Sequence, residues 1–456
     1  MGRTGKLGLR SERLGPLPII GHFLERLGLE ELLGRFVPTR DRRTRLPYAQ
    51  ALGVVVRSIL VEREPIYRQA ETVSTYAPEA FGLDDAVAGD VGDDAIGRAL
   101  DQLFDADRGT LLTEVVVAAS ERLGVVLDEL HNDSTTIRLT GQYHAARGRS
   151  LRGKRAPFIT YGHSKDHRPD LEQLLFVLTT TRDGGVPVQF RCEAGNASDA
   201  RTHEETWEAL VRAAGRPDFL YVADSKLCAG EAMDYIDRRH GRFVTVLPRT
   251  RLEDREFRQW IQAHEPAWER VRDRPHPRRR RGPRDRWSVW RASLPSREGW
   301  PVVWLWSTLL ALHQGQRRRE RLSAAQQELH ALQEQLAAGR SHRRSRPELH
   351  QHIDALVHKH QVERYLRVDL QRTEAHAFRQ EHRGRPGPKT RYRRVTHAGW
   401  HLSATVDEDT IAYDRKSDGM YPLLTNDRTL SPPGGAPARQ QRRSAASRIS
   451  RRPSTG

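Results

Sequence analysis

Hydrophobic and polar residues change their spacing along this chain, and each change marks a different kind of structure. In residues 15–125, apolar residues recur at intervals of three and four, which is the period of an amphipathic helix. The clearest helices are expected at residues 51–62, 97–105 and 111–123. The pattern therefore predicts a helical N-terminal region, in which no helix-turn-helix can be assigned.

From about residue 125 the pattern alternates between short apolar runs and amphipathic helices. Such alternation predicts a sheet covered by helices, and hence an α/β fold. Strands are expected at residues 125–130, 135–139, 186–190, 219–223 and 243–247, and helices at 203–214 and 229–239. Residues 171–178 are apolar enough for either a strand or a helix.

Residues 251–400 interrupt this rhythm. Leu322, Leu329 and Leu336 belong to a run with heptad spacing that restarts at Leu349, which predicts two antiparallel helices. Because the run is short, we favour a hairpin within one chain over a dimer zipper.

Five tryptophans lie between residues 287 and 306. Tryptophans can stack on nucleic-acid bases, but at this density they more often form a small core, which we favour. Residues 400–413 alternate between apolar and polar side chains, as in a strand.

Charge is distributed unevenly over the 456 residues. The net charge of +17 is made up of −2 in residues 1–250, +16 in 251–400, −3 in 401–430 and +6 in 431–456. A basic excess of this size predicts a polyanionic partner, with nucleic acid as the first candidate. Charge alone does not choose between DNA, RNA and an anionic membrane.

Spacing and charge together predict five regions. We expect a helical domain at residues 1–124, a core at 125–250, a basic insertion at 251–399, a β segment at 400–430 and a disordered Arg/Pro tail at 431–456.

The two cysteines, Cys192 and Cys228, are too few for a disulfide framework or a cysteine-rich zinc site. The longest apolar stretches, residues 51–56 and 301–312, are too short or too interrupted to span a bilayer. We therefore expect a cytoplasmic protein with ordinary thiols and no membrane partner.

Two aspartates follow apolar runs. Asp133 comes just after residues 125–130, and Asp224 follows residues 219–223 directly. Carboxylates at strand ends can be held at a fixed distance, and a pair of them can bind two divalent ions for attack at phosphate. Their hard oxygens suit Mg²⁺ or Mn²⁺. An aspartate at a strand end is, however, more often a turn or helix cap.

The polar residues 161–171 allow two interpretations. They form either a solvated loop whose Asp170 caps a following helix, or a loop beside Asp133 that contacts phosphate through Lys165 and Arg168. A metal site at this loop is disfavoured, because no Glu or further His accompanies its two histidines. Those histidines are His163 and His167.

Four consecutive arginines form the strongest local charge. They are Arg278, Arg279, Arg280 and Arg281. Such a run is either a solvated linker or a contact to DNA phosphates, which gives affinity without sequence choice.

Several short segments, in order along the chain, resemble a known family. They are residues 14–20 (LGPLPII), 98–104 (RALDQLF), 131–136 (HNDSTT), 162–171 (GHSKDHRPDL), 195–199 (GNASD), 222–227 (VADSKL), 383–388 (RGRPGP) and 418–427 (DGMYPLLTND). The ordered set resembles bacterial insertion-sequence transposases of the DDE type. The subgroup has a helical N-terminal domain and a large insertion before the third carboxylate.

The resemblance implies a ribonuclease-H-like mixed sheet flanked by helices. It also implies that Asp133 and Asp224 are the first two catalytic carboxylates and bind two Mg²⁺ (or Mn²⁺) ions, which serve cleavage and joining of phosphodiesters. The expected partner is double-stranded DNA, both the inverted-repeat ends of the element and the target. A homodimer on paired ends is characteristic of the family, which acts on DNA in the bacterial cytoplasm and nucleoid.

The chain departs from the family after the last resembling segment. The family carries its third carboxylate on a later helix, but this chain has no Asp or Glu after Asp427. The change to Pro, Gly, Ala, Arg and Ser is what a shifted reading frame would give, so we expect a truncated and inactive transposase. Glu408 or Asp409 is a weak candidate to substitute as a ligand.

Two other functions stay open. The chain could be a non-catalytic DNA-binding protein that inhibits intact transposase, or an RNA-binding or scaffold protein that uses the helical hairpin and the arginines. The gene's reading frames downstream of Leu430 and any flanking inverted repeats would discriminate among the three.

Overall fold

The computed structural model describes residues 12–429, except 142–147, 149, 156, 163–167, 169, 198, 229, 277–281 and 339–344. The chain forms two compact units. Unit 1 contains the described residues up to Val246 together with Thr425–Arg428, and unit 2 contains Leu247–Leu424 and Thr429. No helix among the described residues is long and apolar enough to cross a membrane.

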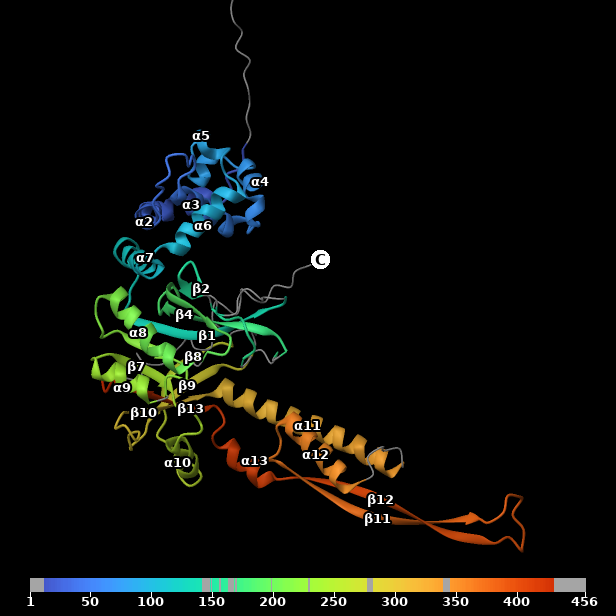
Figure 1. Cartoon of the computed structure of the whole chain (residues 1–456). Coiled ribbons are helices and arrows are strands. Elements are labelled where there is room, and N and C mark those ends of the chain that lie inside the picture. Colours follow the sequence, from blue (N-terminus) through green and yellow to red (C-terminus); the bar gives the residue numbers. More distant parts are fainter. Residues whose placement is uncertain are drawn as a thin grey trace, which may run out of the picture. The chain divides into compact units, whose positions relative to one another are not determined.

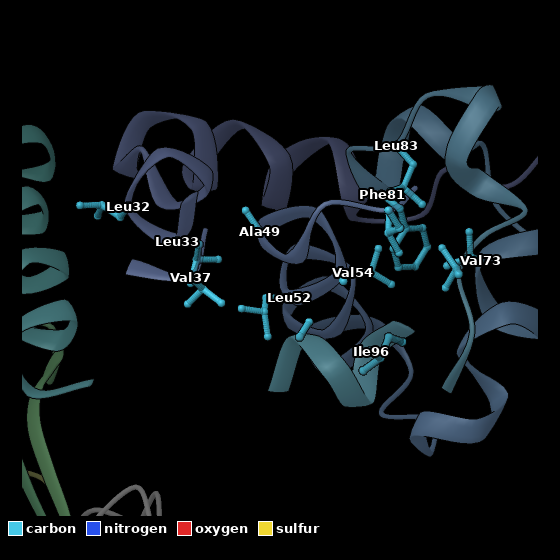
Figure 2. Close-up of a cluster of buried hydrophobic side chains, with 14 of the residues drawn as sticks. Leu32, Leu33, Val37, Ala49, Leu52, Val54, Val73, Phe81, Leu83 and Ile96 are labelled. Atoms are coloured by element: carbon cyan, nitrogen blue, oxygen red, sulfur yellow. The ribbon is translucent and has the colours of Figure 1, made fainter. Parts of the chain in front are cut away.

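The N-terminal part of unit 1 is helical, as the spacing predicts. Its α-helices are α1 (Leu17–Leu27), α2 (Leu29–Phe36), α3 (Tyr48–Val61), α4 (Gln69–Ser74), α5 (Asp85–Ala88), α6 (Asp93–Asp105) and α7 (Arg108–Leu123), with 3₁₀ turns at η1 (Ile66–Arg68) and η2 (Pro78–Phe81). Helix α3 is the most buried because apolar side chains cover it from several directions. Figure 2 shows Val54 and Phe81 on one side of α3 and Leu33 and Leu52 on the other.

A mixed sheet follows in unit 1. Its strands are β1 (Glu129–Leu139), β4 (Glu172–Thr181), β5 (Pro187–Ala194), β6 (Leu220–Ala223) and β7 (Arg242–Val246), in the order β5-β4-β1-β6-β7. Strand β4 is antiparallel to β1 and β5, whereas β1, β6 and β7 are parallel. The expected sheet is therefore present, and residues 171–178, which allowed a strand or a helix, belong to strand β4. A short hairpin, β2 (Ser150–Leu151) and β3 (Lys154–Arg155), precedes β4.

Two helices cover one face of this sheet. They are α8 (Asp199–Ala214) and α9 (Glu231–Arg238). Trp207 of α8 packs against Phe219, just before β6, and against Tyr235 of α9, with ring centroids 6.3 and 6.2 Å away. The aromatic contacts explain why the predicted helices at 203–214 and 229–239 share the same side of the sheet.

Unit 2 contains an antiparallel sheet. Its strands are β8 (Glu269–Arg274), β9 (Asp285–Arg291), β10 (Val302–Ser307) and β13 (Met420–Thr425), in the order β13-β10-β9-β8, and α10 (Leu252–Trp260) precedes them. Trp287, Trp300 and Trp304 are buried, and Phe257 of α10 stacks on Trp304 with 3.5 Å between ring centroids. The tryptophans thus form a core, as favoured from their density.

The predicted helical hairpin is also present. It consists of α11 (Thr308–Ala337) and α12 (Arg346–His360), which lie side by side in Figure 1. Its core contains Leu322, Leu329 and Leu349, all nearly inaccessible to solvent. Ser345 caps α12 by accepting a hydrogen bond from the backbone N–H of Glu348.

A long two-stranded ribbon and a short helix complete unit 2. They are β11 (Leu366–Gln380), β12 (Tyr392–Val406) and α13 (Glu408–Arg415). The prediction of a strand over residues 400–413 is therefore wrong in its second half. Asp407 ends the strand because its side chain accepts a hydrogen bond from the backbone N–H of Thr410 at 2.9 Å, an N-cap that starts α13.

Candidate active site

Asp133 lies inside a strand rather than at its end. Strand β1 begins at Glu129 and continues through Asp133 to Leu139, so the predicted position just beyond a strand at 125–130 is corrected. The reason is that β1 pairs with strands on both sides, and its backbone hydrogen bonds do not require apolar side chains. The Asp133 side chain is exposed.

Asp224 lies at the end of the neighbouring parallel strand. Strand β6 ends at Ala223, and the register pairs Glu129 with Leu220 and His131 with Val222. Continuing this register by two residues places Asp133 level with Asp224, which directly follows β6. Adjacent strands are about 4.8 Å apart, and residues level with each other on parallel strands direct their side chains to the same face.

The shared face is the one that α8 does not cover. Tyr221 accepts or donates a hydrogen bond with Nδ1 of His203 on α8 at 3.0 Å, so the Tyr221 side of β6 faces that helix. Side chains alternate along a strand, which places Val222 and Asp224 on the opposite side. The two carboxylates therefore occupy the face away from α8.

Asp224 is held by local hydrogen bonds. Its Oδ1 accepts from the backbone N–H of Lys226 at 3.0 Å, and its backbone oxygen accepts from Oγ1 of Thr245 on β7 at 2.6 Å. The side chain is half-buried. A carboxylate fixed by a turn on the end of a buried strand has little freedom to move away from its neighbour.

Glu129 faces the same way as Asp133 but is not a third ligand. It lies four residues earlier on β1, about 13 Å along the strand. Its carboxylate also accepts from Arg182 at 2.9 Å and lies 2.8 Å from Nε2 of His131. Among the described residues, no group of three His, Cys, Asp or Glu side chains is arranged to hold a metal ion.

The charge of Asp224 affects the pKa of His203, a buried histidine on the opposite face of the sheet. Burial lowers the pKa of His203 to about 4, although the negative charge of Asp224 acts to raise it. Burial also raises the pKa of Tyr221, and Asp224 adds to that rise. Sequence patterns did not identify His203 as part of this region; its only signal is the spacing to Trp207 and Leu210 on one helical face.

The polar loop before β4 is anchored by two glycines. A Cβ added to Gly162 would lie 2.0 Å from the carbonyl oxygen of Gly195, and one added to Gly195 would lie 2.2 Å from the carbonyl oxygen of Gln173. The Nε2 of buried Gln173 donates to the oxygen of Gly195 at 2.8 Å. Two of the segments that carry the family resemblance thus meet through backbone contacts that exclude side chains.

The charged residues of this loop are only partly described. Arg168 is exposed and pairs with Asp170 at 2.7 Å. Asp170 does not cap a helix, because the next element is strand β4. Lys165, His163 and His167 lie outside the described residues.

The remaining candidates lie in unit 2 or outside the described residues. The structure does not describe the four consecutive arginines, Arg278, Arg279, Arg280 and Arg281. Glu408 and Asp409 occupy the first turn of α13, where carboxylates favourably oppose the helix dipole.

Comparisons with known proteins cover only part of the chain. A family described as a domain of unknown function, DUF4277, matches residues 9–117. No curated protein sequence matches. Among solved structures, the cryo-EM structure of the piggyBac transposase synaptic complex with hairpin DNA aligns with 65% of this chain at 11% identity and a TM-score of 0.28. This chain spans 61% of the length of that chain, and a TM-score of this size carries no argument about fold or function.

Proposed function

We propose that this protein acts in DNA transposition and that unit 1 carries part of a phosphodiester-cleaving site on a ribonuclease-H-like core. The observation that supports this most is the register of β1 and β6, which brings Asp133 and Asp224 level on one face of a mixed sheet. The proposed partner is double-stranded DNA, bound by a homodimer at paired element ends.

The two carboxylates fit a divalent metal ion. They offer hard oxygen donors on one sheet face, and the exposure of Asp133 leaves that side open to solvent. Two Mg²⁺ or Mn²⁺ ions at such a site would activate the attacking water or 3′-hydroxyl and stabilise the leaving oxygen. In this chain, Asp133 and Asp224 would hold the metal, and the turn at Lys226 would keep Asp224 oriented.

We also propose that the two carboxylates support little catalysis by themselves. Two ligands hold an ion less tightly and in poorer geometry than three, and loss of one oriented group typically costs orders of magnitude in rate. Incubation of the purified chain with Mg²⁺ and element-end DNA should give no detectable cleavage. Clear nicking at the element boundary would overturn this part of the proposal.

Metal binding is tested separately from catalysis. When hydrogen peroxide and ascorbate are added, Fe²⁺ bound in place of Mg²⁺ generates hydroxyl radicals that cut the nearby backbone. Cleavage is therefore expected next to Asp133 and Asp224 and should be suppressed by excess Mg²⁺. The variants Asp133→Asn and Asp224→Asn should lose this cleavage. Asp183→Asn, an exposed aspartate in the turn between β4 and β5, is the matched control and should keep it.

A non-catalytic DNA-binding protein that inhibits intact transposase is the alternative. The same variants distinguish this inhibitor from the proposed metal-binding site. An inhibitor that needs only DNA binding keeps its affinity for DNA. It shows no metal-dependent backbone cleavage in either the native chain or the control.

A further inference from the structure

The ribbon of β11 and β12 is anchored at one end only. Leu366, Leu370 and Leu402 are buried in the core of the α11–α12 hairpin. Beyond the pair Leu370–Leu402, β11 continues for ten residues to Gln380, roughly 33 Å at the usual rise of a strand. Figure 1 shows the two strands continuing past α11 and α12 as a narrow arm.

The end of this arm, residues 376–396, is called here the ribbon tip. It contains seven Arg or Lys residues and one acid, Glu381, a net charge of +6. Most of its side chains are exposed. The cations are Arg379, Arg383, Arg385, Lys389, Arg391, Arg393 and Arg394. Within the part of the chain that the structure describes, none of the seven forms an ion pair with a carboxylate, whereas Arg367 near the base of the ribbon pairs with Asp407.

Several features of the ribbon tip destabilise it in the absence of a partner. Arg379 lies directly opposite Arg393, and like charges in this position destabilise a strand pair. Phe378 is 68% exposed and Tyr392 is 49% exposed. A two-stranded ribbon without a core is marginally stable in water. A polyanion that neutralises the arginines would relieve the repulsion between Arg379 and Arg393.

We propose that the ribbon tip enters the major groove of double-stranded DNA and binds the phosphates on both sides of the groove. The major groove of B-form DNA is about 12 Å wide and admits a two-stranded ribbon, and several DNA-binding proteins use one in this way. Arginines along both strands and the turn then lie near phosphates, where charge-assisted hydrogen bonds form. A-form RNA has a deep, narrow major groove that excludes such a ribbon, so the observations favour DNA.

This inference rests on the proposed function for the identity of the polyanion, but it concerns a surface separate from Asp133 and Asp224. It also differs from a contact at residues 278–281. The ribbon tip holds DNA and takes no part in the chemistry at the carboxylates.

The test uses the full chain and a fluorescent 30-bp DNA duplex, with affinity measured over a range of salt concentrations. The triple variant R379Q/R385Q/R393Q should bind roughly tenfold or more weakly. The slope of log K against log salt should become less negative by about 0.9 for each phosphate that the variant no longer neutralises. The control R212Q/R238Q/R239Q removes three exposed arginines from α8, α9 and the residue that follows α9, and it should bind like the native chain.

A second variant guards against misfolding. An Asn-Gly turn joining Ala377 to Val395 removes most of the ribbon tip while keeping the anchored base. It should melt at the temperature of the native chain or above it and bind DNA as weakly as the triple variant. A duplex RNA of the same sequence should bind more weakly than DNA, with no dependence on the ribbon tip.

The outcomes separate the two proposals. Equal DNA affinity of the triple variant and its control would overturn the ribbon assignment and leave the proposed function standing. Tip-dependent binding without metal-dependent cleavage at the aspartates would support the ribbon and overturn the active-site proposal. Absence of DNA binding by the native chain, or equal tip-dependent binding of duplex RNA, would overturn the assignment of the ribbon tip to the DNA major groove.

Discussion

Gly162 and Gly195 touch through their backbones: a Cβ on Gly162 would lie 2.0 Å from the carbonyl oxygen of Gly195. The contact joins the chain before β4 to the chain after β5. Backbone hydrogen bonds reinforce it, with the N–H of Gln173 donating to the oxygen of Thr160 at 2.9 Å and that of Gly195 donating to Phe158 at 3.0 Å. The loop that precedes β4 is therefore fixed by packing that only glycine permits.

Replacing Gly162 with alanine should destabilise unit 1. The added methyl group meets backbone atoms, which cannot rotate away as a side chain can, and overpacking of this kind costs about 1–3 kcal/mol. Thermal or urea unfolding followed by circular dichroism measures the loss. Gly34→Ala is the matched control, because that glycine lies inside α2 with nothing within 4 Å of the new Cβ. The control should gain up to about 1 kcal/mol from helix propensity, and equal effects of the two changes would contradict the packing argument.

His203 should make the protein less stable in mild acid. Its pKa is about 4 in the folded protein and near 6.5 in the unfolded chain. Above pH 6.5, His203 is neutral in both the folded and the unfolded protein, so it causes no loss of stability. As pH falls from 6.5 to 4, the unfolded chain takes up a proton first, so up to about 3 kcal/mol is lost by linkage.

The variant His203→Gln isolates this contribution. Its free energy of unfolding should depend less on pH between 6.5 and 4 than that of the native chain. His22→Gln, which replaces an exposed histidine of α1, is the matched control for the loss of a histidine. Parallel curves for the native chain and His203→Gln would show that the histidine does not titrate in this window.

The spacing of apolar residues along the chain predicted much of this fold, because it depends directly on which side chains are buried. The heptad positions Leu322, Leu329 and Leu349 form the core of the α11–α12 hairpin. The short apolar run before Asp224 is strand β6, whose residues are all buried. In each case the side chains that set the period are the ones that pack.

Other features depend on pairing between distant residues, which no local pattern encodes. The level positions of Asp133 and Asp224 follow from a register between strands about ninety residues apart. Alternation suggested a strand beyond Val406, but the capping side chain of Asp407 started a helix. Only residues 400–406 of the ribbon were predicted as a strand. The rest was missed because the ribbon tip is exposed on both faces and so shows no apolar period.

Leu329 should contribute strongly to the helical hairpin. It is 1% exposed within the core of α11 and α12. The substitution Leu329→Ala removes buried methyl groups and leaves a cavity, at a cost of about 2–5 kcal/mol. Leu312→Ala on the same helix is the control, because Leu312 is 48% exposed and should lose little. Urea denaturation of both variants measures the loss in free energy of unfolding. A small loss for Leu329→Ala would argue against the hairpin core.

Arg318 and Asp418 form an ion pair that fixes the start of β13. Arg318 on α11 donates to Oδ2 of Asp418 at 3.1 Å, and the two side chains are only 12% and 11% exposed. Asp418 opens one of the segments that resemble the transposase family. The next residue, Gly419, has φ +81, and a Cβ there would lie 2.5 Å from the oxygen of Ser307. This part of the segment therefore has a structural role.

Replacing one member of this ion pair should lower the free energy of unfolding more than replacing both members. Arg318→Met or Asp418→Asn alone leaves its partner charged and nearly buried, which typically costs about 3–5 kcal/mol. The double variant leaves no buried charge and should be more stable than the sum of the single losses predicts. A double-mutant cycle from urea unfolding measures the coupling. Arg317→Met, an exposed neighbour on α11, should be close to neutral, and additive losses in the cycle would show that the two charges do not depend on each other.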